Sequence, residues 1–139
     1  MQSGLLRYNS HMSNLILGEI DITPLLDAKK NLDAGILSAS SDLEKTGAIK
    51  AFEFCFELSW KAMKRILAKK GLQVTSPRDA FRVAADNELI KDPETWFKFI
   101  DKRNLTVHTY DKKIAEEVLK FLPTFQQELN EFIKTITKL

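Results

Sequence analysis

Residues 48–70 read AIKAFEFCFELSWKAMKRILAKK, and this stretch decides the fold. Its apolar residues recur every three or four positions, which is the spacing of an α-helix and not of a strand. Phe52 and Phe56 lie on one helical stripe, whereas Phe54 and Leu58 lie on a second. A helix that is apolar on two faces is normally central in a bundle, or is shared between a core and a dimer interface. We therefore expect residues 48–70 to form the central helix of an all-helical domain.

Helical spacing continues on both sides of this segment, and strand signals are weak. Gly71 follows the central helix, and Gly47 precedes it with Thr46 as the expected N-cap. The predicted fold class is all-α, an antiparallel four-helix bundle with one extra short helix. The first predicted helix covers residues 24–43, and a short one covers residues 76–88 and begins with Ser76-Pro77. Another begins at Asp92, and its apolar face includes Val107. The last is capped by Asp111, and Pro123 predicts a kink or a short break within it.

The composition fits one soluble domain. The chain has 139 residues, of which 44% are hydrophobic and 29% charged. Ser10-His11-Met12 reads like the remnant of an expression tag, so residues 1–11 are interpreted as foreign and residues 12–139 as a single domain. On this interpretation His108 is the only native histidine, and with a single cysteine the chain predicts no metal site.

Cys55 excludes an internal disulfide because it is the only cysteine, which fits a cytoplasmic location. It lies between Phe54 and Phe56, so we expect a buried structural thiol and not a nucleophile. No stretch approaches the roughly 18 apolar residues of a membrane span. We therefore expect no membrane association.

The net charge of +2 is not the footprint of a general nucleic-acid-binding protein. Any contact with RNA must therefore be local. The second half of the central helix is rich in basic residues, which we interpret as a solvated helix face. These residues are Lys61, Lys64, Arg65, Lys69 and Lys70.

The segment 101–111, DKRNLTVHTYD, gathers Arg103, Asn104, His108 and Tyr110 at the end of an amphipathic helix. An arginine neutralises phosphate oxygens, a histidine exchanges a proton near neutral pH, and an amide can orient either group. Asn104 and His108 share a face while the helix continues. Arg103 and His108 are five positions apart, so they converge only if the helix ends early or a second copy contributes across a dimer. Spacing alone also fits capping and packing roles.

The chain resembles the HEPN domains in two motifs. Arg103, His108 and Tyr110 match the pattern R-x4-H-x-Y, and Glu57 with Lys61 matches E-x3-K. Three blocks in order, residues 52–61, 76–78 and 101–111, resemble the substrate-binding-subunit family that pairs with minimal nucleotidyltransferases. The resemblance covers nearly all of the chain from about Asp21 onward.

The resemblance implies a helical bundle similar to the helical domain of antibiotic nucleotidyltransferases. It also implies a homodimer, since members of the family usually dimerise. It implies a minimal nucleotidyltransferase as partner in a toxin–antitoxin-like pair, with RNA as a further ligand. Arg103 and His108 would then carry metal-independent ribonuclease chemistry, with Asn104 orienting the site. Tyr110 would be the modified or regulatory position, since the partner adenylylates this tyrosine in some pairs. The supporting residues on the central helix would be Glu53, Glu57 and Lys61.

The chain lacks the paired-aspartate motif and the strand-based Gly-Ser motif of a nucleotidyltransferase. It is therefore not expected to transfer nucleotides itself and needs no cofactor, since the partner would bind the nucleoside triphosphate and magnesium. Three hypotheses remain: a regulatory and binding subunit of a nucleotidyltransferase, a metal-independent ribonuclease toxin, and a non-catalytic helical dimer. The first two are compatible, because one protein can be both a toxin and the substrate of its partner.

Overall fold

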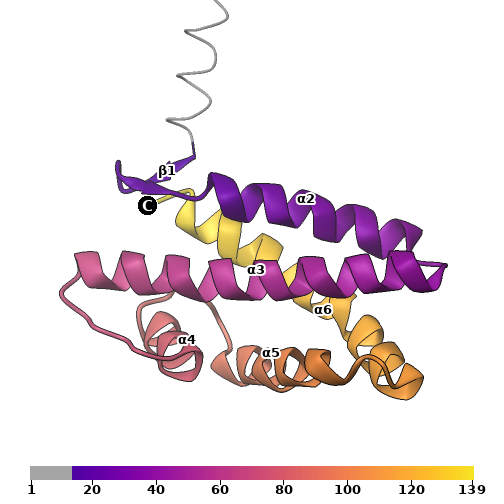
Figure 1. Ribbon diagram of the computed structural model, residues 1–139. Coiled ribbons are helices and arrows are strands. Elements are labelled where there is room, and N and C mark those ends of the chain that lie inside the picture. The colour runs from indigo at the N-terminus through magenta and orange to yellow at the C-terminus, as the bar shows by residue number, and fades with distance from the viewer. Residues whose placement is uncertain (1–13) are drawn as a thin grey trace, which may run out of the picture.

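The computed structural model describes residues 14–139 (Figure 1). The interpretation of residues 1–11 as a tag lies outside them. A short antiparallel pair, β1 (Leu15–Ile16) and β2 (Ile20–Asp21), precedes the helices, with Leu15 opposite Asp21. The helices are α2 (Thr23–Ser38), α3 (Asp42–Lys69), α4 (Pro77–Asp86), α5 (Pro93–Leu105), the 3₁₀ turn η1 (Thr106–His108) and α6 (Lys112–Ile136).

Helix α3 lies in the middle of the bundle, as its two apolar stripes predict. Figure 1 shows α2 on one side of α3, α4 and α5 on the other, and α6 behind them. Helix α3 packs against all four of these helices. The all-α prediction is thus confirmed, with α4 as the short helix and the two-residue strands as the only sheet among the described residues.

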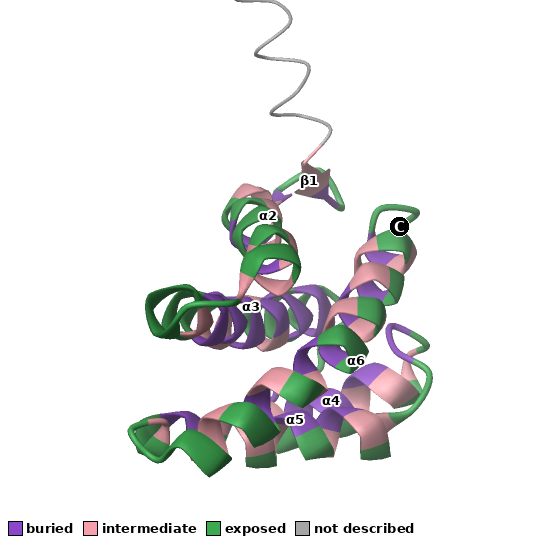
Figure 2. Ribbon diagram, turned by 90° about the vertical axis from the view of Figure 1, so that its right-hand side faces the viewer, coloured by how far each residue is buried: buried purple, intermediate pink, exposed green. Residues whose placement is uncertain are grey.

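Aromatic side chains fill the interior between α3, α4, α5 and α6. The inward faces of the helices are buried (Figure 2). Trp96 on α5 is fully buried at the centre of the aromatic group. The Trp96 ring lies 5.1 Å from the Phe81 ring and 5.2 Å from the Phe99 ring, measured between centroids. Phe125 of α6 meets Phe52 of α3 edge to face at 4.9 Å. Such edge contacts add to the free energy gained from burial, so this cluster carries much of the stability.

The boundary between the first two long helices differs from the prediction. Helix α2 ends at Ser38, and α3 begins at Asp42, before Gly47. The reason is a capping box. The Ser41 hydroxyl accepts from the backbone N–H of Glu44, and the Glu44 carboxylate accepts from the backbone N–H of Ser41. These hydrogen bonds, chiefly the one from the Ser41 backbone, lower the pKa of Glu44 to about 2.

Three smaller expectations need correction or refinement. Val107 is predicted on the apolar face of α5, but the helix ends at Leu105 and Val107 is 66% exposed. Leu43, predicted in the first helix, lies in the first turn of α3 and is also exposed. Of the kink or short break predicted at Pro123, the break is excluded, because α6 is continuous from Lys112 to Ile136.

Cys55 is buried, as its apolar neighbours predict. Burial raises the pKa of its thiol to about 12, with a smaller contribution from Asp33. A thiol with such a pKa stays protonated at neutral pH, which excludes a nucleophilic role at that pH.

At Gly35, α2 lies close against the backbone of α3. A Cβ atom at this position would lie 3.0 Å from the Cα atom of Ala48, which belongs to the backbone of α3 and cannot rotate away. We expect Gly35→Ala to lower the free energy of unfolding by about 1–3 kcal/mol, because the two helices must move apart. Urea unfolding followed by circular dichroism measures this change.

The matched control is Gly47→Ala. Gly47 is also helical, but a Cβ atom added to it would meet nothing within 4 Å. This substitution should stabilise the protein by about 0.5–1 kcal/mol, because alanine restricts the unfolded chain and favours a helix. Equal effects of the two substitutions would show that the α2–α3 contact is looser than described.

Candidate functional site

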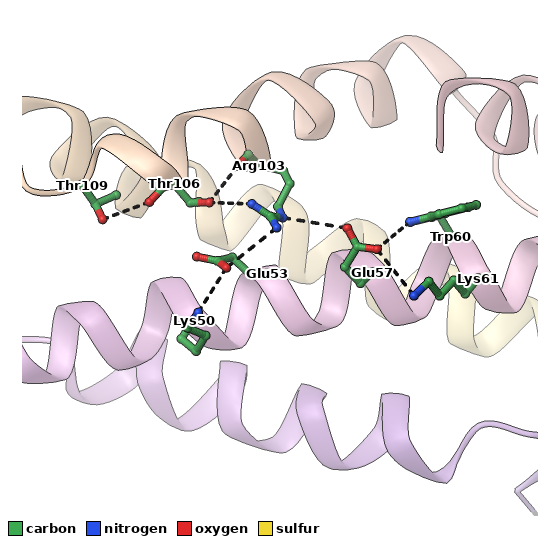
Figure 3. A network of polar contacts seen from close by, with 8 residues as sticks. All are labelled: Lys50, Glu53, Glu57, Trp60, Lys61, Arg103, Thr106 and Thr109. Carbon is green, nitrogen blue, oxygen red and sulfur yellow. Dashed lines mark hydrogen bonds and ion pairs between the residues drawn. The ribbon is translucent and has the colours of Figure 1, made fainter. Parts of the chain in front are cut away.

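The end of α5 is fixed by two threonines that the sequence interpretation did not single out. The Thr106 hydroxyl is positioned between groups of Arg103: it donates to the carbonyl oxygen at 2.7 Å and accepts from Nη1 at 2.9 Å. The Thr109 hydroxyl donates to the Thr106 carbonyl oxygen at 3.2 Å. Figure 3 shows these contacts beside α3. The helix therefore ends early, at Leu105. An early end was one of the two conditions under which Arg103 and His108 could converge.

Arg103 reaches from α5 toward two acids on α3. Its Nη2 atom lies 4.0 Å from a carboxylate oxygen of Glu53, and its Nε atom lies 4.0 Å from one of Glu57. Both distances are too long for hydrogen bonds, although the charges attract. The Nε–H group is buried and has no hydrogen-bond partner. The guanidinium therefore keeps unused donor capacity, unlike the fully satisfied pair that a purely structural role would give.

The two acids are themselves held in place along one face of α3. Glu57 accepts from the indole N–H of Trp60 at 3.0 Å and lies 4.0 Å from the Lys61 ammonium. Glu53 pairs with Lys50 at 3.4 Å. The predicted supporting residues Glu53, Glu57 and Lys61 are thus brought together with Arg103 (Figure 3). Lys50 and Trp60 have no role in the sequence interpretation, although their three-residue spacing from the acids is a usable signal.

His108 and Tyr110 form the second half of the site. The Nδ1 atom of His108 lies 3.1 Å from the Tyr110 hydroxyl, and the two rings meet edge to face. Both side chains are exposed, and Tyr110 is 82% exposed. The geometry fits a phenol next to a group that can accept its proton, provided that Nδ1 is the unprotonated ring nitrogen.

The two halves are neighbours in the chain, but they are not joined by side-chain contacts. Within residues 14–139, no hydrogen bond or ion pair links Arg103 to His108, and Asn104 is exposed without a hydrogen bond to either. The expected common face of Asn104 and His108 is lost because α5 ends at Leu105. A substrate or a second protein chain would have to bridge Arg103 and His108.

Two further features are absent from the described part of the chain. No group of three His, Cys, Asp or Glu side chains among residues 14–139 is placed to hold a metal ion. None of the helices described is long and apolar enough to cross a membrane.

Residues 21–138 match the family described as nucleotidyltransferase substrate binding protein like. This match covers most of the chain, so the chain belongs to that family.

Two solved structures are similar over nearly their whole length. One is HI0074 from Haemophilus influenzae, described as having the fold of a substrate binding domain of a nucleotidyltransferase. It is 28% identical with a TM-score of 0.77, and the match covers 84% of this chain and 98% of HI0074. The other is the crystal structure of ttk003001694 from Thermus thermophilus, which is 29% identical with a TM-score of 0.76 over 81% of this chain and 98% of its own.

A curated relative carries a different description. The probable ribonuclease HepT of Haemophilus influenzae is 38% identical over 84 residues, which span 57% of this chain and 58% of the relative. The chain thus aligns with little more than half of that relative.

Proposed function

We propose that this chain is the helical subunit of a two-protein system, in which a separate nucleotidyltransferase binds it and acts on Tyr110. The observation that carries this proposal is the pairing of a highly exposed tyrosine with His108 at 3.1 Å. An exposed phenol next to a hydrogen-bonded turn is reachable by the active site of another protein. The family match and the likeness to HI0074 support association with a nucleotidyltransferase.

The reaction at Tyr110 is a nucleotidyl transfer. The phenolic oxygen forms a bond to the α-phosphorus of a nucleoside triphosphate, the bond from that phosphorus to the bridging oxygen breaks, and pyrophosphate leaves. The phenolic proton passes to His108 Nδ1. The partner supplies the triphosphate and its magnesium. This chain supplies the acceptor, the proton-accepting group and the fixed turn that holds both.

A second candidate function is metal-independent cleavage of RNA, which the relative described as a probable ribonuclease favours. The Arg103 guanidinium would bind the scissile phosphate through Nη2, which forms no hydrogen bond with a described residue and lies 4.0 Å from Glu53. The ribose 2′-oxygen bonds to phosphorus as the bond to the 5′-oxygen breaks, so one proton leaves the 2′-hydroxyl and one reaches the 5′-oxygen. His108 of one protomer can perform only one of these transfers at a time, and a second copy in a homodimer would supply the other.

We propose that the homodimer forms through the face of α3 that carries Phe54. The Phe54 side chain is 56% exposed, and the Lys50 ammonium lies 5.9 Å from its ring centroid. Lys50 also pairs with Glu53, which faces Arg103. An exposed aromatic residue so close to the Arg103 network would place the two sites of a dimer near each other.

Expression in a bacterial host tests both functions together. We expect the protein alone to arrest growth. Co-expression of a candidate partner nucleotidyltransferase from the same genome should relieve the arrest and add one or more nucleotidyl groups to the protein. Intact mass measurement detects this addition. Tyr110→Phe keeps the ring but removes the acceptor oxygen, so it should abolish the mass increase.

The controls separate the two functions. His108→Ala should abolish both growth arrest and RNA cleavage if the ribonuclease function holds. A protein that neither arrests growth nor cleaves RNA, but is modified at Tyr110, would leave only the first function. Failure to co-purify with the nucleotidyltransferase, together with an unchanged mass, would contradict the first function.

A further inference from the structure

The first turns of α6 carry a row of lysines whose charge is not compensated. We call Lys112, Lys113 and Lys120 the lysine ridge. All three are exposed, and none forms an ion pair with any residue in the range 14–139. The row spans about 12 Å of helix at 1.5 Å per residue. Its charge was not visible from the near-neutral total of the chain.

The acids between these lysines do not neutralise them. Glu116 pairs with Lys45 of α3 at 3.0 Å, and Glu117 pairs with Lys102 of α5 at 3.1 Å. Each acid is thus matched by a lysine from another helix. Two further acids lie nearby, Asp111 at the start of α6 and Asp42 on α3, so the three ridge lysines keep a local excess of one positive charge.

The ridge is continuous with the candidate site. Lys112 and Glu116 line a hollow whose wall also includes Thr109 and Tyr110, with Lys45 and Asp42 from α3 on the other side. A second hollow next to it is lined by the ridge lysines with Glu116 and Glu117. A chain lying along α6 would therefore reach Tyr110, whose neighbour is His108.

We propose that the lysine ridge binds the phosphodiester backbone of single-stranded nucleic acid and directs it to the His108–Tyr110 pair, where the Tyr110 ring stacks on a base. Lysine ammonium groups bind phosphates as point charges without reading sequence. An exposed aromatic ring at the end of a basic track is the usual stacking partner in single-strand binding. The biological meaning of this binding rests on the second proposed function, although the binding itself does not require cleavage.

A nucleic acid fits this surface better than a protein does. The centres of protein interfaces are depleted in lysine and enriched in apolar anchors. The two hollows offer exposed lysines, and the only large exposed hydrophobic residue on their walls is Tyr110. In the basic half of α3, Lys61 lies near Glu57 and Lys69 pairs with Glu19, whereas Lys64 and Lys70 form no ion pair with a described residue and so offer control positions.

The test measures binding of a short fluorescent 2′-O-methyl RNA, which cannot be cleaved through its 2′-oxygen, to the full chain. The triple variant Lys112→Gln, Lys113→Gln and Lys120→Gln should weaken binding about tenfold or more. It should also reduce the slope of log affinity against log salt by about 2, because each single-strand phosphate contact contributes about 0.7. The substitutions do not endanger the fold, since all three side chains are exposed and removing the charges of Lys112 and Lys113 from the first turn of α6 is favourable.

The matched control removes three other lysines. Lys64, Lys70 and Lys91 are exposed and form no ion pair within the described chain, so their replacement by glutamine changes the net charge equally. This control should bind within about twofold of wild type. Tyr110→Leu should weaken binding about fivefold or more, whereas Tyr110→Phe should keep it, because stacking needs only the ring.

Two outcomes would overturn the proposal directly: wild type does not bind the oligonucleotide, or the ridge and control variants weaken binding equally. A third would also overturn it: the ridge variant binds the oligonucleotide as wild type does but no longer co-purifies with the nucleotidyltransferase. The last result would make the ridge a protein-docking surface. A parallel assay with unmodified RNA separates this inference from the proposed function. Ridge-dependent binding without cleavage would remove the ribonuclease function and leave the ridge intact.

Discussion

Replacing Trp96 by alanine is expected to lower the free energy of unfolding by about 3–5 kcal/mol, a large part of the total stability of a domain this size. Trp96 is fully buried, and its ring meets those of Phe81, Phe99, Phe125 and Phe132. Alanine would leave a cavity surrounded by these rings, which come from three helices and cannot all move inward. Thermal unfolding should therefore occur about 10–20 °C lower.

Trp96→Phe is the informative control for this cavity. The indole N–H of Trp96 is buried without a hydrogen-bond partner. Phenylalanine loses some volume but also removes this unsatisfied donor, so the two effects oppose each other and the net change should stay within about 1.5 kcal/mol. Urea unfolding followed by far-ultraviolet circular dichroism measures both variants. A mild effect of Trp96→Ala would contradict the central position of this residue in the core.

Replacing Arg103 by lysine is expected to reduce RNA cleavage by about 100–1,000-fold, if the ribonuclease function holds. Lysine keeps the charge but loses the planar fork that binds two phosphate oxygens. Stability should change by less than about 1.5 kcal/mol, because the two acids lie 4.0 Å away and the main loss is the hydrogen bond from Nη1 to the Thr106 hydroxyl. Cleavage of a labelled RNA and thermal unfolding give the two readouts.

The matched control for Arg103 is Arg82→Lys. Arg82 is exposed on α4, away from the segment 101–111, and should retain full activity. Loss of more than about 2 kcal/mol of stability in Arg103→Lys would instead assign Arg103 a structural role. Unchanged cleavage by a stable Arg103→Lys variant would remove Arg103 from the proposed chemistry.

The sequence predicts the helical elements well where local signals agree. Ser76-Pro77 and Asp92-Pro93 begin α4 and α5 as expected, with both capping side chains accepting from backbone N–H groups. The predicted start of α3 is wrong because Gly47 resembles a break. The helix tolerates this glycine, and the capping box of Ser41 and Glu44 fixes the start instead. Competing local signals of similar strength are decided by the packing of the whole helix.

The candidate site is likewise predictable from the sequence only in part. Residue types and the resemblance to the HEPN motif pick out Arg103, His108 and Tyr110 as candidates, and their roles stay predictions. Sequence could not show that Arg103 is held by Thr106, or that His108 meets Tyr110 and not Asn104. These contacts depend on the turn after Leu105, where the helical periodicity that supports sequence interpretation stops.

The sequence by itself determined the helical class, the central position of residues 48–70 and the chemical character of the segment 101–111. Each of these follows from periodicity and residue type within one stretch of chain. Only the tertiary structure decided which charges remain uncompensated. Lys45 and Lys102 are far from Glu116 and Glu117 in sequence but pair with them in space, which leaves the lysine ridge free. Charge compensation depends on distance in three dimensions, and composition does not contain that information.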